Sequence, residues 1–124
     1  MKIIRVICVN PSAEERQKVC GILRTFPLFR LIESFSSMRD ARTLMEKTAP
    51  ELLICHEDND VTDISGYTRD LKRNPEYLIL SHDPAVGIRA LERGAVFLQY
   101  PVTPEKMALA LWRAYENLLF KKIQ

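Results

Sequence analysis

His56 is a residue whose type and position could do chemistry. It ends an apolar run, and its imidazole has a reference pKa near neutrality. A ring nitrogen could therefore accept a phosphoryl group, or the ring could sense pH. The alternative is a partly buried histidine that is hydrogen-bonded at the edge of a sheet. We favour this structural interpretation.

Three aspartates that follow His56 could bind a cation. Asp58, Asp60 and Asp63 have a spacing, D-x-D-x-x-D, that resembles the start of a calcium-binding loop. The glycine and the bidentate glutamate that such a loop needs are missing at the required offsets. The sequence therefore favours a solvated acidic loop.

The tripeptide Ser81-His82-Asp83 holds the residue types of a hydrolytic relay. Residues that are adjacent in a chain do not normally form such a relay, because their side chains cannot line up in series. Ser81 also lacks the surrounding glycine pattern of a nucleophile elbow. A hydrolase is therefore a weak interpretation of this segment.

Length and composition predict one globular domain, residues 1–124, with 47% hydrophobic and 27% charged residues. A net charge of +2 gives no basic face for nucleic acid. There is no apolar run long enough for a membrane span and no signal-peptide pattern at the start. We therefore expect a cytoplasmic protein. Its cysteines, Cys8, Cys20 and Cys55, are expected to be buried small hydrophobes rather than a metal or redox site.

Short apolar runs alternate with helical patterns along the chain. The expected strands cover residues 2–9, 29–35, 51–56, 77–81 and 95–99. Helices are expected over residues 12–26, 38–47, 67–72, 84–94 and 104–120. Ser12 and Glu15 match a capping box, and Ser37 can cap the second helix. This alternation predicts an α/β fold, a parallel sheet with helices on both faces.

The order of elements, with PELLIC before a polar loop, GY after it and ALERGAVFLQYP near the end, resembles the receiver domain of two-component response regulators. The resemblance spans essentially the whole chain, and its most specific part is residues 90–101. It is closest to receivers that precede LytTR-type DNA-binding domains. It implies a doubly wound, flavodoxin-like sheet with strand order 2-1-3-4-5, and a cis peptide bond between Tyr100 and Pro101. Sites in such folds lie at the carboxyl ends of the central strands.

The receiver pocket, carried over residue by residue, is largely lost. The family uses two acids, an acceptor aspartate and a lysine around Mg²⁺, a hard ion that prefers oxygen ligands. This sequence has Asn10 and Pro11 at the positions of the acids, His56 at the acceptor and Tyr100 at the lysine. Ser81 alone matches.

These replacements remove the chemistry of the pocket. Asn10 offers one neutral carbonyl oxygen and Pro11 no ligand atom, so Mg²⁺ has little reason to shed its water. Without metal and lysine, phosphoryl transfer loses its charge stabilisation. We therefore expect no metal and no cofactor. Phe97 stands at the family's switch aromatic, the ring that changes rotamer when the Ser/Thr moves.

The last helix presents apolar residues on two sides. Its inward stripe is expected to be Met107, Leu111, Ala114 and Leu118. Leu109, Trp112 and Phe120 then fall close to the opposite side, and Trp is favoured at interfaces. The alternative is that Trp112 leans onto a neighbour within the monomer. In receivers the last two helices and fifth strand form the common dimer and partner face, which favours an interface.

The function predicted from the sequence is that of a degenerate receiver. Such a chain is not an enzyme, acts through a protein partner or homodimer without aspartyl phosphorylation, and binds neither membrane nor nucleic acid directly. A complete protein and the N-terminal domain of a transcriptional regulator both fit.

Two alternatives stay open. One is a receiver that is switched by an unusual acceptor, His56 or Asp58, or by a small ligand in the altered pocket. The other is a small α/β enzyme or nucleotide binder. The segment VNPSAEE argues against the latter, because it lacks the glycines of a phosphate loop.

Overall fold

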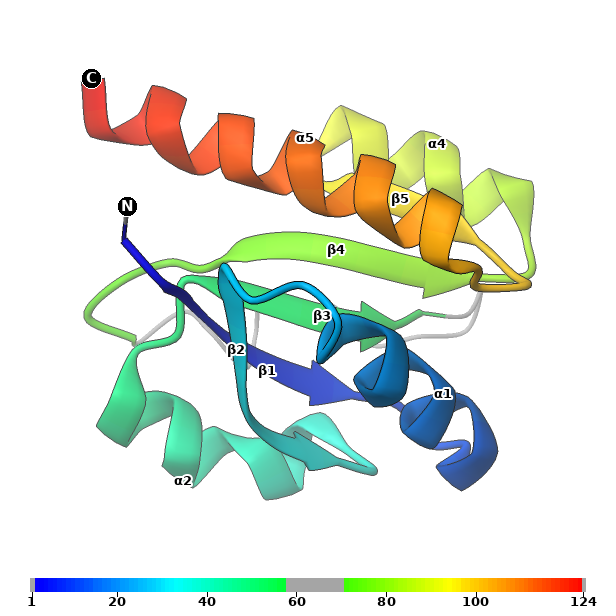
Figure 1. Ribbon diagram of the computed structural model, residues 1–124, viewed down its shortest axis with the longest axis horizontal. Coiled ribbons are helices and arrows are strands. Elements are labelled where there is room, and N and C mark those ends of the chain that lie inside the picture. The colour runs from blue at the N-terminus through cyan, green and yellow to red at the C-terminus, as the bar shows by residue number, and fades with distance from the viewer. Residues whose placement is uncertain (1, 58–70, 124) are drawn as a thin grey trace.

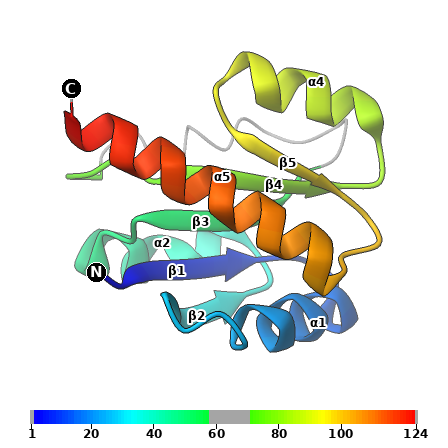
Figure 2. The same ribbon diagram turned by 45° about the horizontal axis from the view of Figure 1, so that its top comes forward.

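The computed structural model describes residues 2–57 and 71–123 of the chain. Its sheet has five parallel strands in the order β2-β1-β3-β4-β5, which confirms the predicted topology (Figure 2). The strands are β1 (Ile4–Val9), β2 (Phe29–Phe35), β3 (Leu52–His56), β4 (Glu76–Ser81) and β5 (Val96–Gln99). The helix expected over residues 67–72 lies largely outside the described residues.

Helices cover both faces of the sheet (Figure 1). Side chains of α1 (Ala13–Leu23) and α5 (Pro104–Ile123) share one core cluster. Those of α2 (Met38–Thr48) and α4 (Pro84–Glu92) share another. The expected inward stripe of α5 is confirmed, since Met107, Leu111 and Ala114 are buried and Leu118 packs partly against them. No described helix has both the length and the apolar character needed to cross a membrane.

The central strands are apolar on both faces because helices cover both. Along β1, Val6 and Cys8 point into the cluster beneath α1 and α5, whereas Ile7 and Val9 point into the other. This alternation follows from the two-residue period of a strand. The continuous apolar run in the sequence is therefore the signature of a strand buried between two layers.

Local hydrogen bonds set where α1 and α2 begin. Ser12 Oγ accepts from the Glu15 N–H at 3.2 Å, and Ser37 Oγ caps α2 in the same way at 3.1 Å. The expected return bond of the Ser12–Glu15 capping box is wrong. The Ser12 N–H instead donates to Asn10 Oδ1 at 3.0 Å.

Two helix ends differ from the predicted bounds. The first helix ends at Leu23 rather than before Pro27, because the N–H groups of Thr25 and Phe26 bond to carbonyls three residues back and tighten the chain into turns. The last helix continues beyond residue 120 to Ile123.

Candidate functional site

Residues from three strand ends meet at the hydroxyl of Tyr100. Asn10 follows β1 and donates from Nδ2 to Tyr100 Oη at 2.9 Å. His56 ends β3, and its Nδ1 lies 2.9 Å from the same oxygen. The hydroxyl already accepts from Asn10, so its own proton can be donated to His56 Nδ1. The structure thus joins three of the replaced pocket positions in one hydrogen-bonded cluster, which we call the Tyr100 cluster.

Asn10 is held on every side. It is 1% exposed, and its Oδ1 accepts the Ser12 N–H at the start of α1. Its backbone N–H donates to the Phe35 carbonyl at 3.0 Å, and its backbone carbonyl accepts from Arg16 Nη1 at 2.7 Å. The side-chain oxygen that might have served a metal is therefore part of the helix cap. Pro11, beside it, is exposed.

Tyr100 is fixed by its backbone and by its ring. The Tyr100–Pro101 peptide bond is cis, as predicted, and the Tyr100 N–H donates to the Ser81 carbonyl at 3.1 Å. The ring lies 4.3 Å from the His82 ring and 5.7 Å from the His56 ring, measured between centroids. Tyr100 is 8% exposed, so its ring fills the space where the resemblance placed a lysine.

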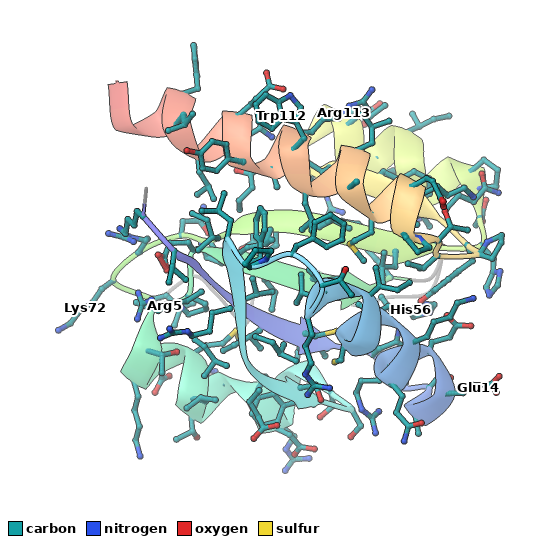
Figure 3. All side chains as sticks on the ribbon, in the orientation of Figure 1. Arg5, Glu14, His56, Lys72, Trp112 and Arg113 are labelled. Atoms are coloured by element: carbon teal, nitrogen blue, oxygen red, sulfur yellow. The ribbon has the colours of Figure 1, made fainter. Side chains whose placement is uncertain are left out.

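His56 is a partly buried, hydrogen-bonded histidine at the end of β3, as the structural interpretation predicted (Figure 3). Sequence reasoning missed the contact of His82 with Tyr100. The one available signal was its place directly after the expected fourth strand, at the sheet edge that holds the other pocket positions.

Ser81 does not face a relay. Its hydroxyl, in a residue 1% exposed, accepts the backbone N–H of Asp83 at 3.1 Å. The Asp83 carboxylate in turn accepts the Ala85 N–H at 2.9 Å and caps α4. These bonds give Ser81 and Asp83 structural tasks at the start of the helix.

The acid nearest the acceptor position is also engaged. Glu57 is 6% exposed, and its Oε2 lies 2.6 Å from Arg93 Nη2 at the end of α4. Asp58, Asp60 and Asp63 lie outside the described residues. Among the described residues, no cluster of three or more His, Cys, Asp or Glu side chains could hold a metal. The described groups at this site therefore do not fit Mg²⁺, which prefers several carboxylate or phosphate oxygens.

The three cysteines are free and buried, as predicted. A hydrogen bond from Cys8 lowers the pKa of Cys20 to about 6. The same hydrogen bond, together with burial, raises the pKa of Cys8. Burial raises the pKa of Cys55 well above its ordinary value, with a smaller contribution from Glu57. Because its pKa is raised, the Cys55 thiol is neutral, and Cys55, which precedes His56 in β3, is a packing residue.

We expect Tyr100→Phe to keep the fold and lower the free energy of unfolding by about 1–3 kcal/mol. The change leaves a buried Asn10 N–H and His56 Nδ1 without the hydroxyl that serves both. The matched control is Tyr77→Phe, whose hydroxyl makes an exposed bond to Asn74 Oδ1 and whose loss should cost less than about 0.5 kcal/mol. Urea denaturation compares the two. Equal losses would mean that the Tyr100 cluster adds no stability of its own.

Phe97 packs closely on α4. The ring is partly buried, and a Cβ added at Gly87 would lie 2.6 Å from two of its atoms. Because real Cβ atoms do not approach so closely, the glycine is what allows this ring to pack so close to the helix. Phe97 is the predicted switch aromatic, and its present position thus depends on one residue of α4.

We expect Gly87→Ala to destabilise the protein by about 1–3 kcal/mol, because the methyl group overpacks the contact with Phe97. The control is Gly21→Ala in α1, where no atom lies within 4 Å of the added Cβ. A helical glycine in open space should gain about 0.5–1 kcal/mol when replaced by alanine. Thermal unfolding of both variants gives the sign of each stability change. A gain in stability of similar size for both variants would contradict the close packing of Phe97 on Gly87.

The outward residues of α5 are exposed as predicted. Leu109, Trp112 and Phe120 are 57%, 58% and 62% exposed. Two residues of α4 that the sequence argument did not select, Ile88 and Leu91, are 62% and 67% exposed. They lie on α4, which packs on the opposite face of the sheet from α5.

The apolar residues of α5 nevertheless divide between two sides. Leu109 lines a hollow with Phe97 and Arg113, on the side of β5. Trp112 lines a different hollow with residues 26–29, next to the end of α1, and its ring centroid lies 6.0 Å from that of Tyr115. Trp112 therefore lies toward α1, at the margin of the face formed by α4, β5 and α5 rather than at its centre.

The architecture is similar to solved receiver domains. Vibrio cholerae chemotaxis protein CheY4 is 21% identical, with a TM-score of 0.73 over 90% of this chain and 98% of that chain. A signal receiver domain from Vibrio parahaemolyticus is 16% identical, with a TM-score of 0.78 over 98% and 96%. The response regulator domain of Thermotoga maritima CheB is 19% identical, with a TM-score of 0.72 over 94% and 97%.

These similarities show that the chain has the receiver fold. No protein-family model and no curated protein sequence matches it. At such low identity the likeness concerns the backbone. What the site does must therefore be argued from its own side chains.

Proposed function

We propose that this chain is a degenerate receiver, a cytoplasmic regulatory module that works by protein contact and not by aspartyl phosphorylation. The observation that carries the proposal is the Tyr100 cluster. Asn10, Tyr100 and His56 bond to one another at the positions where a working receiver would need an acid, a lysine and an acceptor.

The cluster opposes metal binding in two ways. First, Mg²⁺ would have to displace the hydrogen bonds of Asn10 Oδ1 to Ser12 and of Asn10 Nδ2 to Tyr100. Each such bond contributes about 1 kcal/mol to stability. Second, the carboxylate of Glu57, next to His56, already pairs with Arg93 and is not free to compensate for the dehydration of the ion.

Complexes of similar structures support action through macromolecular contact. CheY6 of R. sphaeroides is described in complex with the P1 domain of CheA3, and this fold matches that structure with a TM-score of 0.72 at 21% identity. RcsB of Salmonella enterica is described bound to a promoter, and the chain spans 65% of that longer protein.

By analogy, a protein partner or a second copy would bind at α4, β5 and α5. The chain could then be the receiver part of a transcriptional regulator, including one of LytTR type. Nucleic acid binding would belong to another domain of such a regulator, not to this one.

The test is treatment with acetyl phosphate in the presence of Mg²⁺. We expect no added phosphoryl group by intact mass spectrometry, because the acceptor aspartate and its metal ligands are replaced. An NMR titration should show no saturable Mg²⁺ shifts at Val9, His56 and Ser81 up to low-millimolar metal.

A stable phosphoryl adduct, or saturable shifts at those residues, would overturn the proposal in favour of an unusual acceptor. His56→Ala and Asp58→Ala would then locate it.

A further inference from the structure

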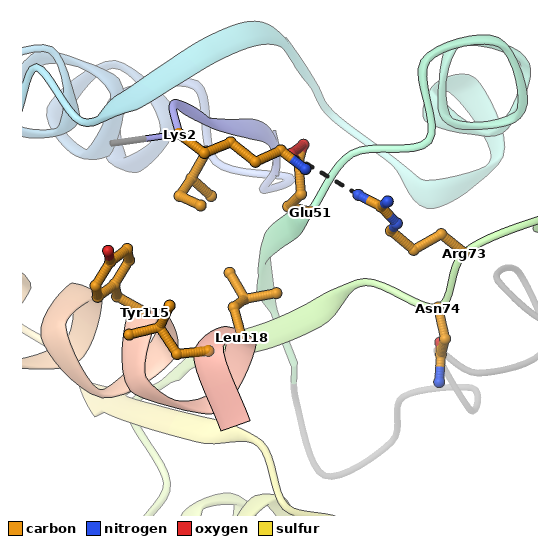
Figure 4. A pocket seen from close by; sticks show the side chains of 8 residues that line it. Lys2, Glu51, Arg73, Asn74, Tyr115 and Leu118 are labelled. Atoms are coloured by element: carbon orange, nitrogen blue, oxygen red, sulfur yellow. Dashed lines mark ion pairs between the residues drawn. The ribbon is translucent and has the colours of Figure 1, made fainter. Parts of the chain in front are cut away.

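A hollow of about 350 Å³ lies at the amino edge of the sheet, at the opposite end of the strands from the Tyr100 cluster. Its polar side is formed by Lys2, Glu51 and Arg73, which lie before β1, β3 and β4. Its apolar side is formed by Tyr115, Leu118 and Leu119 of α5 (Figure 4). This volume lies in the range of small-molecule sites.

Glu51 is a buried carboxylate with one oxygen unserved. The residue is 3% exposed, and its Oε1 accepts from Arg5 Nε at 2.8 Å and from the Arg5 N–H at 3.3 Å. Its Oε2 is buried and has no hydrogen-bond partner. Buried polar atoms are almost always paired, so this oxygen calls for a donor.

Two cations stand near that oxygen without bonding to it. Lys2 Nζ lies 3.8 Å and Arg73 Nη1 3.9 Å from Glu51 Oε2, which is ion-pair range but too long for a hydrogen bond. Figure 4 shows the two side chains reaching toward Glu51 from opposite sides. Both are 50% exposed, so each can turn toward an incoming acceptor and uncover Oε2 as it does so.

The local charge favours an anionic group on the ligand. Lys2, Arg5 and Arg73 face Glu51, and the neighbouring carboxylate of Glu76 already accepts from Asn117 Nδ2 at 2.9 Å. The described charged groups here are thus three cations against two carboxylates. One positive charge is left over. An arginine can bind the carboxylate of a ligand in bidentate geometry.

One ligand chemistry matches the three features. Oε2 can accept from a donor, the two half-exposed cations can turn from Glu51 to an anion close to that donor, and the α5 wall can contact an apolar chain. An α-amino acid carries an ammonium and a carboxylate on one carbon. We infer that this hollow binds an apolar α-amino acid, with its ammonium on Glu51, its carboxylate on Lys2 and Arg73, and its side chain on α5. This inference does not depend on the proposed receiver function.

The test is an NMR titration of the full chain with L-leucine and two truncated probes. One probe, 4-methylpentanoate, lacks the amine, and the other, 3-methylbutan-1-amine, lacks the carboxylate. We expect leucine to cause saturable shifts at the backbone amides of Lys2, Glu51 and Arg73, while Asn10 and Tyr100 stay unchanged. Each truncated probe should bind at least tenfold more weakly, because it leaves one polar partner unserved.

Variants separate binding from folding. Arg73→Ala changes a half-exposed side chain and should weaken leucine binding at least tenfold with the fold intact. Arg42→Ala is the matched control, because it removes an exposed ion-pair arginine on α2, and it should leave binding unchanged.

Two results would overturn the inference. One is the absence of saturable shifts with leucine. The other is binding of 4-methylpentanoate as tight as that of leucine, which would show that Glu51 is not used and that the hollow takes a simple carboxylate.

Discussion

We expect a variant with the receiver pocket residues restored to become phosphorylated under conditions in which the natural chain does not. The four changes are Asn10→Asp, Pro11→Asp, His56→Asp and Tyr100→Lys. They supply two metal-ligand acids, an acceptor carboxylate and a cation at positions that the fold already brings to one edge of the sheet. Carboxylates let Mg²⁺ replace part of its water shell, and metal and lysine together neutralise the transferred group.

The expected result is one added phosphoryl group by intact mass after acetyl phosphate and Mg²⁺, with none on the natural protein. The change is from undetectable to a measurable fraction of the chain. The control is the same variant with His56→Ala in place of His56→Asp, which keeps the metal ligands and lacks the acceptor. Circular dichroism must first show that each variant is folded, because Asn10 and Tyr100 contribute hydrogen bonds to the native site.

An inert but folded variant would show that more than these four residues separates this chain from a working receiver. The contact of Phe97 with Gly87 would be the next feature to change. Phosphorylation of the natural chain would instead reject the proposal that the pocket is degenerate.

Most of the fold could be predicted because local and long-range signals agree. The central strands are continuous apolar runs, and each is followed by a polar segment and a helical pattern. A parallel sheet covered on both faces explains this arrangement. The strand order came from the resemblance, and the structure confirms it. The errors are at helix ends, where one or two hydrogen bonds determine the last helical residue, as with the turns that end α1 at Leu23.

The Tyr100 cluster could be predicted in position but not in bonding. The resemblance placed Asn10, His56 and Tyr100 at one edge. The sequence gives no sign that a tyrosine hydroxyl would join residues 90 and 44 positions away. That bond depends on side-chain rotamers and on the depth of the Tyr100 ring, which are fixed only when the strands pair.

The hollow at the amino edge had no sequence signal at all. Lys2, Glu51 and Arg73 are far apart in the chain and belong to three different strand starts. Each alone reads as an ordinary charged residue, and only the parallel order of β1, β3 and β4 brings them together.

The division of the α5 surface likewise needed the structure. Helical spacing places Leu109 and Trp112 on the same outward half of α5. In the structure, residues 26–29 lie beside Trp112, whereas β5 lies beside Leu109.

The position of Trp112 on α5 leads to a prediction about association. We expect Trp112→Ala to weaken self-association, or binding to a partner, by more than tenfold. Burial of a large aromatic in an interface is worth about 2 kcal/mol or more, and about 1.4 kcal/mol corresponds to tenfold. Trp112 is 58% exposed in the single chain, so its apolar surface is available to a second protein.

The same substitution should cost little fold stability, because the inward stripe of α5 is untouched. Sedimentation equilibrium and urea denaturation measure both quantities on one variant. The matched control is Ile3→Ala, a 41% exposed apolar residue beside β1, which should change neither by much. Leu109→Ala and Leu91→Ala test the side of the face nearer α4.

The pattern of losses identifies the surface that is used. Losses at Trp112 together with Leu109 and Leu91 would place the contact across α4, β5 and α5 with Trp112 at its margin. A loss at Trp112 alone would place it over the hollow between α5 and residues 26–29, with α1 as the neighbouring element. Unchanged association together with a stability loss of several kcal/mol would contradict the interface. Trp112 would then be a packing residue held by Tyr115, since losses of that size come from disrupted packing and not from exposed contacts.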